Sequence, residues 1–578
     1  AAGGSPGPGA SVAFLTNITG VNQVWRVQSP GSWPVQLTFE PDRVASVTCS
    51  PDGKWLCFER DQGGDEHNQL YLIPPQGGVP RALTANPKAI HSFGGFSPDS
   101  GRIAFTSTER NGTDFDGYVL DLATGKRERI YARGGYCSVA CWSPDGIRLI
   151  LSRANSNVDG DLFLVNLADR SVRHLTPHQG AANFQFVQWP APGTHLFLAT
   201  DLGREFVTLA RMEVEKGVES LEFLEPDRHD VDALAVSDDG TRLAMARNMD
   251  GYSALLTGTP QKFEPVEHPQ GVMDGFAFSP DGKRLTLTFV SPVEPPNVYV
   301  LQDDRLQRVT ESTLAGVDPA SFVSPTLVRY PTFDGKQIPA FLFLPARRTG
   351  KVPAIVSVHG GPEAQTRASF SGLSQYFLSR GYAVMAPNVR GSTGYGRTFT
   401  HLDDVRLRMD SVKDLEYANR YLAEGGVVAP DRIAVMGGSY GGYMTLAAVT
   451  FQPQRWAAGV DIVGISNFIS FLNNTGAYRR ALRIAEYGDP VKDEAFLREV
   501  SPFFHVDEIQ APMLIIQGAN DPRVPQSESD QMVASLKKKG LPVEYLLYQD
   551  EGHGLAKLSN RVDAYTRAVA FLDRHLKR

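Results

Sequence analysis

In the first half of the chain, short runs of apolar residues alternate with turns that repeat nearly the same four letters. The phrase Ser-Pro-Asp-Gly or a close variant begins at Ser50, Ser97, Ser143, Ser237 and Ser279, in steps of 47, 46, 94 and 42 residues. A related phrase, Trp-Pro-Ala-Pro-Gly, begins at Trp189 near the midpoint of the double step. Proline and glycine supply the fixed and positive backbone angles that tight turns between strands require. The first half is therefore predicted to be one repeated unit of β-strands.

A period of roughly 40 to 50 residues with about four strands per unit is typical of a β-propeller, in which each unit forms one blade. Upstream of the first full repeat, three further apolar segments resemble the later strands of another blade: 12–15, 23–27 and 34–38. The sequence thus predicts that residues 11–315 form a seven-bladed β-propeller whose first blade is incomplete. Two stacked β-sandwiches, the alternative, would not produce so regular a spacing.

Beyond residue 310 the repeats cease, and apolar runs alternate with segments of helical period. Strands are predicted at 338–344, 354–358, 383–386, 433–436, 513–516 and 543–548, and helices at 411–423 and 562–576. This alternation indicates a mostly parallel sheet covered by helices on both faces, with its site at the carboxyl ends of the strands. Together with the motifs described below, it predicts a two-domain protein whose residues 320–578 form an α/β-hydrolase catalytic domain.

Length, charge and hydropathy argue against nucleic-acid binding and against a membrane-spanning protein. The chain has 578 residues, more than one hydrophobic core accommodates. Its 57 Lys and Arg residues, against 64 Asp and Glu residues, form no basic run, so nucleic acid is not expected as a partner. No run of eighteen apolar residues is present, and the first ten residues lack both a basic start and an apolar core. Neither a membrane span nor a signal peptide is therefore expected.

The cysteines and the remaining motifs add little further chemistry. Cys49, Cys57, Cys137 and Cys141 show neither a metal-site spacing nor a dense disulfide framework. Buried thiols in a reducing compartment, and hence a cytoplasmic protein, are the expectation. We find no cofactor or metal motif and expect no cofactor. The sequence leaves the number of subunits open, and a homo-oligomer is compatible with it.

One serine lies in the context of a nucleophile. The segment Gly437-Gly438-Ser439-Tyr440-Gly441 matches the nucleophile elbow, a sharp turn from strand to helix that lifts a serine hydroxyl above the sheet. The motif alone is weak, and residues 3–7 match it as well. Ser439, however, follows an apolar strand and precedes a helical run, as the elbow requires. Ser439 is therefore the predicted nucleophile.

A serine hydroxyl needs a base, and the base needs an acid that orients it. Only His505, His553 and His575 follow Ser439. Asp521 comes directly after the predicted strand 513–516, and in this fold the acid precedes the histidine, which excludes His505. His575 lies within the terminal helix, whereas His553 lies in a glycine-rich loop after the strand 543–548. The predicted catalytic triad is therefore Ser439, Asp521 and His553.

Acyl transfer also needs hydrogen-bond donors aimed at the developing oxyanion. His-Gly-Gly-Pro at 359–362, directly after the strand 354–358, is similar to the glycine-rich loop that supplies one backbone N–H in such enzymes. We predict the N–H of Gly361 as one donor and the N–H of Tyr440 as the other. A simple glycine turn is the alternative interpretation of this loop.

Taken together, the propeller and three motifs resemble the prolyl oligopeptidase family, most closely its acylaminoacyl peptidase branch. The motifs are Gly-Gly-Ser-Tyr-Gly-Gly-Tyr-Met at 437–444, His-Gly-Gly-Pro at 359–362 and Asn-Val-Arg-Gly-Ser-Thr-Gly-Tyr-Gly at 388–396. The resemblance implies a serine peptidase whose propeller caps the site and admits only short, flexible peptides. It also implies that Arg523 holds a substrate carbonyl and that Glu66 faces it from the propeller. An ordinary surface ion pair is the alternative for these two residues.

Specificity is less well defined by the sequence. Phe468, Phe471 and Tyr478 follow the elbow without a tryptophan, which favours a general apolar or aromatic pocket over a prolyl-specific one. Arg479 and Arg480 continue this segment, and arginine binds carboxylates through two hydrogen bonds. One alternative is therefore a carboxypeptidase that captures the peptide C-terminus, although a solvated helix face would show the same pattern.

Two other functions use the same features differently. An esterase could employ the same triad on small acyl esters, because a fold does not determine a substrate. The propeller disfavours this function, since a small ester needs no size filter. A binding protein with a decayed hydrolase domain is the third alternative, and the complete triad and oxyanion loop argue against it.

Overall fold

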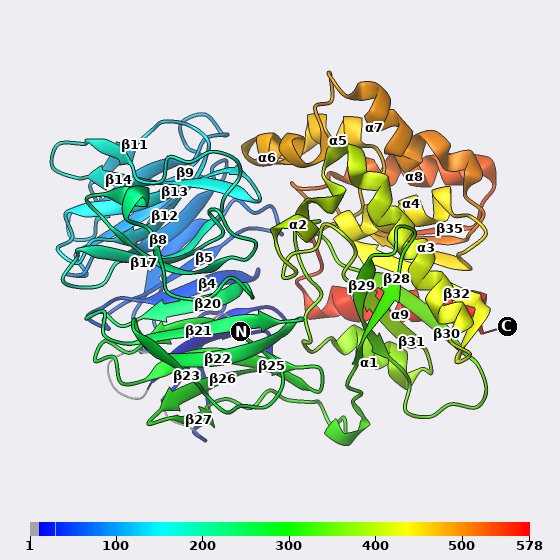
Figure 1. The fold of residues 1–578 in the computed structure, drawn as a ribbon, viewed down its shortest axis with the longest axis horizontal. Helices are drawn as coiled ribbons and strands as arrows, with labels where there is room; N and C mark the ends of the chain where they lie inside the picture. The colour runs from blue at the N-terminus through cyan, green and yellow to red at the C-terminus, as the bar shows by residue number, and fades with distance from the viewer. Residues whose placement is uncertain (1–10, 29–30, 578) are drawn as a thin grey trace.

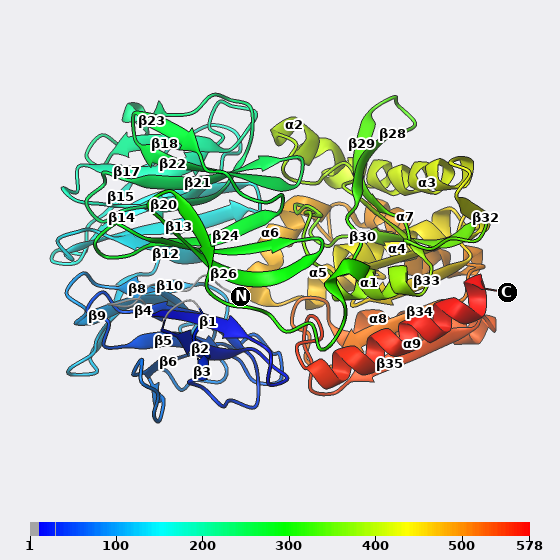
Figure 2. The same ribbon diagram turned by 90° about the horizontal axis from the view of Figure 1, so that it is seen from below.

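The computed structural model describes residues 11–28 and 31–577 and shows two domains side by side, an all-β domain and an α/β domain (Figures 1 and 2). The second nucleophile-elbow match, at residues 3–7, lies outside the described residues. Among the helices of the described ranges, none is both long and apolar enough to cross a membrane.

The first domain is a seven-bladed β-propeller, as the repeats predict. Its first sheet has three antiparallel strands and each of the other six has four. The first four blades are β1–β3 (Val12–Thr16, Gln23–Val27, Val35–Gln36), β4–β7 (Val44–Cys49, Leu56–Arg60, Gln69–Ile73, Arg81–Ala82), β8–β11 (His91–Phe96, Arg102–Ser107, Asp116–Asp121, Arg127–Tyr131) and β12–β15 (Tyr136–Trp142, Arg148–Ser156, Asp159–Asn166, Val172–His174). The last three are β16–β19 (Phe184–Gln188, His195–Thr200, Thr208–Glu213, Glu222–Phe223, with η1 at Gly217–Ser220), β20–β23 (Val231–Val236, Leu243–Met249, Tyr252–Thr259, Lys262–Pro265) and β24–β27 (Val272–Phe278, Leu285–Ser291, Glu294–Gln302, Arg305–Arg308).

The repeated turn has the same chemistry in five blades. The serine hydroxyl donates a hydrogen bond to the aspartate two residues later, over 2.5 to 2.7 Å between the oxygens. The same aspartate oxygen accepts a backbone N–H two residues further on. In the divergent repeat, the indole N–H of Trp189 donates instead to the carbonyl of Gly193, at 3.0 Å. The serine and aspartate of the motif thus close the turn that joins the first two strands of a blade.

Apolar side chains between neighbouring blades hold the ring together. The ring closes where Val12, Phe14 and Val27 of the first blade pack against Val298 and Val309 at the last blade. The incomplete first blade is therefore joined to the seventh by side-chain packing, which removes the two exposed edges that an open arrangement would leave.

The second domain is built on one eight-stranded sheet, in the order β28-β29-β31-β30-β32-β33-β34-β35. The strands are β28 (Thr326–Pro331), β29 (Gln337–Phe343), β30 (Val352–Val358), β31 (Ala383–Pro387), β32 (Val428–Gly438), β33 (Ala458–Ile462), β34 (Met513–Gly518) and β35 (Val543–Tyr548). β28 and β29 pair antiparallel to their neighbours, whereas β31 to β35 form a parallel sheet with β30. The prediction of a mostly parallel sheet is confirmed.

Helices cover both faces of this sheet (Figure 2). They are α1 (Gly372–Ser379), α2 (Arg397–Thr400), α3 (Arg408–Glu424), α4 (Tyr440–Phe451), α5 (Phe468–Asn474), α6 (Ala477–Tyr487), α7 (Glu494–Val500), α8 (Gln526–Lys539) and α9 (Leu558–Leu576), with short 3-10 helices η2 (Pro319–Ser321), η3 (His401–Asp403), η4 (Val405–Leu407) and η5 (Pro502–Glu508). Ile433 and Val435 of β32 join the core beneath α3 and α4, whereas Ala434 and Met436 join the core beneath α1 and α9. Because side chains alternate across a strand, each apolar run fills two cores at once.

Candidate active site

Ser439 lies at the turn between β32 and α4. Its backbone has φ 59° and ψ −121°, a strained conformation for a residue with a Cβ atom. A Cβ on Gly437 would overlap the carbonyl oxygen of Gly441, and a Cβ on Gly441 would overlap that of Val358. The glycines of the motif are therefore needed so that β32, α4 and β30 can approach one another and expose the serine hydroxyl.

Ser439, His553 and Asp521 form one continuous chain of hydrogen bonds. The Oγ of Ser439 lies 2.9 Å from Nε2 of His553, and Nδ1 of His553 lies 2.7 Å from Oδ2 of Asp521. Asp521 is buried, and His553 is largely buried. This arrangement can move a proton from the hydroxyl to the imidazole while the carboxylate holds the imidazole in place.

The backbone around Asp521 orients its carboxylate. Oδ1 of Asp521 accepts the N–H of Arg523 at 2.8 Å and the N–H of Val524 at 3.0 Å. A Cβ on Gly518, at the end of β34, would overlap the carbonyl of Gly552. The absence of a side chain at Gly518 therefore lets the histidine loop pack close to the aspartate turn.

The two predicted oxyanion donors come from different elements. Tyr440 opens α4, and the first N–H groups of a helix have no partner within it. The loop that contains Gly361 follows β30, and a Cβ on the preceding Gly360 would lie 3.3 Å from Cβ of Ser439. The carbonyl of Gly361 accepts hydrogen bonds from the Tyr487 hydroxyl at 3.3 Å and from Nη1 of Arg483 at 3.4 Å. The glycine loop therefore lies beside the serine.

Arg523 and Glu66 meet across the domain interface. Nε of Arg523 lies 2.7 Å and 2.9 Å from the two carboxylate oxygens of Glu66, and the Tyr478 hydroxyl donates to Glu66 at 3.2 Å. The Glu66 side chain is 12% exposed and that of Arg523 is 45% exposed. Burial opposes ionisation of Glu66, but the hydrogen bond and charge of Arg523 lower its pKa below the usual value. The pair is thus an interdomain contact rather than an isolated surface ion pair.

The aromatic residues after the elbow occupy different environments. Phe468 and Phe471 are each 1% exposed, and their rings pack against Tyr487 at centroid distances of 4.8 and 6.0 Å. Tyr478 instead lies against the propeller, with its ring 6.1 Å from that of Phe115. The two phenylalanines form part of the core next to the site, so that contact between them and a substrate stays a prediction.

The two arginines of the predicted cluster, Arg479 and Arg480, differ in their contacts. Nη2 of Arg480 donates to the carbonyl of Asn473 at 2.6 Å. In the described part of the chain, the Arg479 guanidinium has no hydrogen-bonded acceptor. Burial, together with the charges of Arg483 and Arg523, lowers the pKa of Arg479. Arg479 is therefore the member of the cluster with a side chain available for an anion.

A propeller loop between β5 and β6 contacts both loops that carry the acid and the base, a feature that the sequence did not predict. Nδ2 of Asn520, next to the acid, donates to the carbonyl of Gly63 at 2.9 Å. A Cβ on Gly64 would overlap the backbone of Gly552, next to the base. The adjacent glycines were the only local signal, and they do not reveal a partner almost 500 residues away.

The structure also contains an interdomain cavity of about 410 Å³ that the sequence did not predict. Five acidic residues from the fifth and sixth blades and from the loops after β30 line it: Asp201, Glu205, Asp230, Asp232 and Glu363. Burial raises the pKa of Asp230 to about 6. These residues are dispersed over three segments, so no sequence motif joins them.

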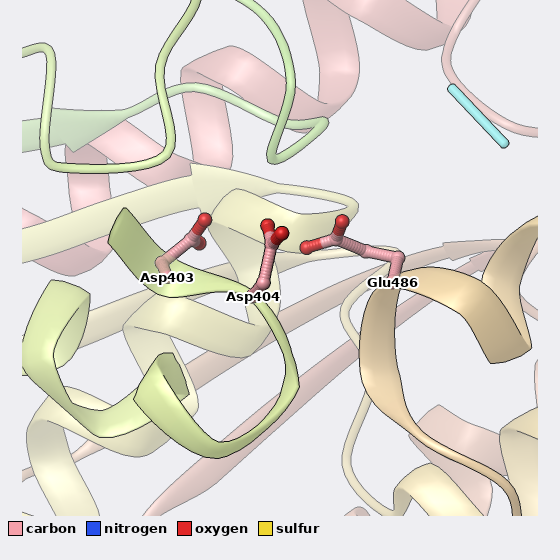
Figure 3. Close-up of side chains that lie close together, drawn as sticks. All are labelled: Asp403, Asp404 and Glu486. Atoms are coloured by element: carbon pink, nitrogen blue, oxygen red, sulfur yellow. The ribbon is translucent and has the colours of Figure 1, made fainter. Parts of the chain in front are cut away.

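Three carboxylates converge behind the elbow (Figure 3). Ligand atoms of Asp403, Asp404 and Glu486 lie within 4.8 Å of one another. The guanidinium of Arg408 forms ion pairs with both Asp403 and Glu486, and Asp404 lies 2.7 Å from Nδ1 of His401. Arg408 therefore already supplies a cation to two of these acids, and His401 is a hydrogen-bond partner of the third.

Comparison with known proteins gives one family. Residues 368–578 match the prolyl oligopeptidase family. Dipeptidyl aminopeptidase BIII of Pseudoxanthomonas mexicana is 32% identical over 96% of this chain and 83% of its own length. The acylamino-acid-releasing enzyme of Arabidopsis thaliana is 29% identical over 40% of this chain and 31% of its own length. Two solved structures have the same fold: one from a study of two prolyl endopeptidases, with a TM-score of 0.88 and 20% identity over 100% of this chain and 90% of that one, and a puromycin-hydrolysing peptidase of Mycobacterium tuberculosis, with 0.87 and 22% over 100% and 94%.

Proposed function

Because this chain belongs to the prolyl oligopeptidase family of serine peptidases, we propose that it hydrolyses short peptides through an acyl-enzyme formed on Ser439. The observation that carries the proposal is the hydrogen-bonded chain from Ser439 through His553 to Asp521 at the strand-to-helix turn. In this mechanism His553 takes the hydroxyl proton as Ser439 attacks the peptide carbonyl, and then gives the proton to the leaving amine. Asp521 holds the imidazole in the tautomer that carries its proton on Nδ1.

The charge that develops on the carbonyl oxygen is stabilised by the N–H groups of Tyr440 and Gly361. Both residues adjoin Ser439, one in the chain and the other through the neighbouring glycine loop. Each such donor is worth roughly a hundredfold or more in rate. Arg523, held by Glu66, binds a substrate carbonyl next to the scissile bond. Loss of Arg523 is therefore expected to affect substrate binding, whereas loss of Ser439 removes turnover.

The propeller limits access to short peptides. Its residues contact the segments that follow four strands of the catalytic sheet: Asn157 with Glu363 after β30, Glu205 with Thr398 of α2 after β31, Glu66 with Arg523 after β34, and Gly64 with Gly552 after β35. The propeller therefore covers the carboxyl ends of the strands, where the triad lies. A matched series of peptides, together with a folded protein that contains the same sequence, tests this role. Cleavage of the folded protein at the peptide's rate would contradict it.

The subclass we propose is the acylaminoacyl-peptidase or oligopeptidase type. A dipeptidyl aminopeptidase is a second candidate, favoured by the match of that named relative over 96% of this chain. A carboxypeptidase is a third, favoured by the Arg479 guanidinium, which has no acceptor in the described ranges. An esterase acting on small acyl esters remains the alternative outside the peptidases.

The first experiment compares wild type with Ser439→Ala on peptides with free, acetylated or amidated ends, with products identified by mass spectrometry. Cleavage by wild type alone is the expected result. Release of an acylated residue, a dipeptide, a last residue or an internal fragment then assigns the subclass. Equal activity of both proteins would contradict the serine mechanism, and hydrolysis of esters without peptides would contradict the peptidase.

Arg479→Ala and Arg480→Ala separate the carboxypeptidase from the other candidates. If Arg479 captures a peptide C-terminus, its replacement raises KM for free but not for amidated peptides. Arg480→Ala is the matched control, because that guanidinium is engaged by the chain itself. Unchanged KM values for both peptide types in Arg479→Ala would exclude this candidate.

We also propose a reducing compartment such as the cytoplasm, which the four free cysteines support.

A further inference from the structure

A buried arginine lies directly behind the nucleophile turn. Arg408, the first residue of α3, is 1% exposed. Its guanidinium forms ion pairs with the carboxylates of Asp403 and Glu486 and donates from Nη1 to the hydroxyl of Tyr440 at 2.8 Å. Figure 3 shows Asp403 and Asp404 next to each other, at the end of η3, and Glu486 on α6. One cation therefore links η3, α3, α4 and α6.

The side chain of Tyr440 is held at both its ring and its hydroxyl. The hydroxyl interacts with Arg408, with Oγ of Ser411 at 3.0 Å and with Oδ2 of Asp403 at 3.1 Å. The ring stacks on that of Tyr487, with centroids 6.2 Å apart and planes at 21°. Because the N–H of Tyr440 is the proposed oxyanion donor, these contacts restrict how far that N–H can turn.

The other proposed donor is held from α6 as well. Tyr487 and Arg483, both on α6, donate hydrogen bonds to the carbonyl of Gly361. Glu486, between them in the chain, pairs with Arg408. Three residues of one helix therefore reach both donors, Gly361 directly and Tyr440 through Arg408.

Stability alone is a poor reason for this arrangement. Burial raises the pKa of Asp403 and of Glu486 in spite of the Arg408 charge, so two acids and one base are kept out of water at a cost. Buried ion pairs are often no more stable than apolar side chains of similar volume. Buried ion pairs provide a fixed geometry instead, because moving one partner leaves the other charge buried and uncompensated, which is strongly destabilising.

We propose that Arg408 and α6 form a positioning network that sets the N–H groups of Tyr440 and Gly361 toward one oxyanion. This inference rests on the proposed function, because it assumes that these two groups are the donors. The network does not touch the substrate. It acts by holding the donors where the tetrahedral intermediate needs them, so it contributes to the transition state rather than to substrate binding.

Tyr440→Phe and Tyr487→Phe test the network, since each removes one hydroxyl and no charge. Complete loss of a donor costs roughly 100- to 1,000-fold in kcat, so a displaced donor is expected to cost on the order of tenfold. KM should stay within about twofold. The inhibition constant of a peptide boronic acid, which forms a tetrahedral adduct, should rise by the same factor by which kcat/KM falls.

Tyr443→Phe is the matched control. Tyr443 is a buried tyrosine of the same helix, and its hydroxyl donates to the carbonyl of Val500 at 3.1 Å rather than to a member of the network. All three variants are compared for kcat, KM and melting temperature. The proposal is overturned if Tyr440→Phe and Tyr487→Phe lose no more kcat than Tyr443→Phe. It is also overturned if their KM changes by more than about twofold, or if the inhibition constant of the boronic acid does not rise as kcat/KM falls.

Ser439→Ala separates a failure of the positioning network from a failure of the proposed function. If Ser439→Ala abolishes turnover while the three tyrosine variants behave alike, the serine mechanism stands and only the positioning network fails. If Ser439→Ala retains turnover, the proposed function fails.

Discussion

Asp521→Asn is predicted to leave the fold intact and to remove most of the catalysis. Oδ1 of Asp521 accepts two backbone N–H groups, from Arg523 and Val524, whereas Oδ2 accepts Nδ1–H of His553. In asparagine, an NH₂ group at the Oδ1 position would face those two donors and leave them unsatisfied. Each unsatisfied buried donor costs about 1–3 kcal/mol, so the amide oxygen is confined to the Oδ1 position.

The NH₂ group must then face Nδ1 of His553, which can only accept from it. The imidazole proton moves to Nε2, 2.9 Å from the Ser439 hydroxyl, and His553 can no longer take the serine proton. The same change in another Ser-His-Asp triad lowers kcat by about 10⁴-fold, and we expect a loss of that order here. KM should change little, because the substrate contacts are retained.

The assay measures kcat and KM on a short peptide that wild type cleaves, with melting temperature recorded for each protein. Asp530→Asn is the control, because Asp530 lies on the exposed face of α8, where its carboxylate accepts the Tyr545 hydroxyl at 2.8 Å and the Gln526 amide at 3.1 Å, away from the triad. If Asp521→Asn keeps more than about a tenth of wild-type kcat, or if its loss of activity is explained by unfolding, the tautomer argument is wrong.

Three further predictions follow from the interface and the cavity. Glu66→Gln removes the charge that holds Arg523, so kcat/KM should fall about fivefold, because a partly exposed ion pair is worth about 1 kcal/mol. This fall should become smaller at high salt, and a salt-independent change would argue against an electrostatic role. Gly552→Ala places a Cβ against the backbone of Gly64, so kcat should fall more than tenfold. Gly372→Ala should retain activity, because its Cβ would meet only the Phe370 ring, at an ordinary contact distance of 3.9 Å; equal effects of the two variants in steady-state assays would contradict this. Burial raises the pKa of Asp230 to about 6, so the folded state binds more protons than the unfolded state between about pH 4 and 6, and this acid destabilises the fold increasingly as pH rises through that window. Asp230→Asn should therefore gain about 1–2 kcal/mol of unfolding free energy relative to wild type between pH 4.5 and 7, and a constant difference in denaturant titrations at the two pH values would refute the assignment.

Much of the architecture was predictable because its signals are local. The Ser-x-Asp turn is closed by hydrogen bonds between residues two positions apart, so the same residues recur in the sequence with each blade that has this turn. The elbow requires glycine at 437 and 441 for steric reasons that act within one turn. Asp521 and His553 could be predicted because parallel strands carry their carboxyl ends to one edge of the sheet.

The contacts of the candidate site with the rest of the molecule were less predictable. Glu66 was identified through the resemblance to a family, and no local pattern indicates that Arg523 is its partner. The contact of Gly64 with Gly552 joins segments from different domains, and the path of the backbone, rather than a side chain, decides it. Phe468 and Phe471, predicted as substrate contacts from their place after the elbow, lie in the core because α5 turns its apolar face inward.

The sequence by itself thus determined the number of blades, the parallel sheet and the order of the predicted triad, because short-range turns and side-chain periodicity encode them. Only the tertiary structure decided which charges are neutralised and which remain available. Acceptors within the chain bind the guanidinium groups of Arg408, Arg480 and Arg483. The guanidinium of Arg479 has no acceptor among the described residues, and the residue type alone does not distinguish it from the other three. Burial and long-range packing, which set the energy of each charge, arise only when distant segments meet.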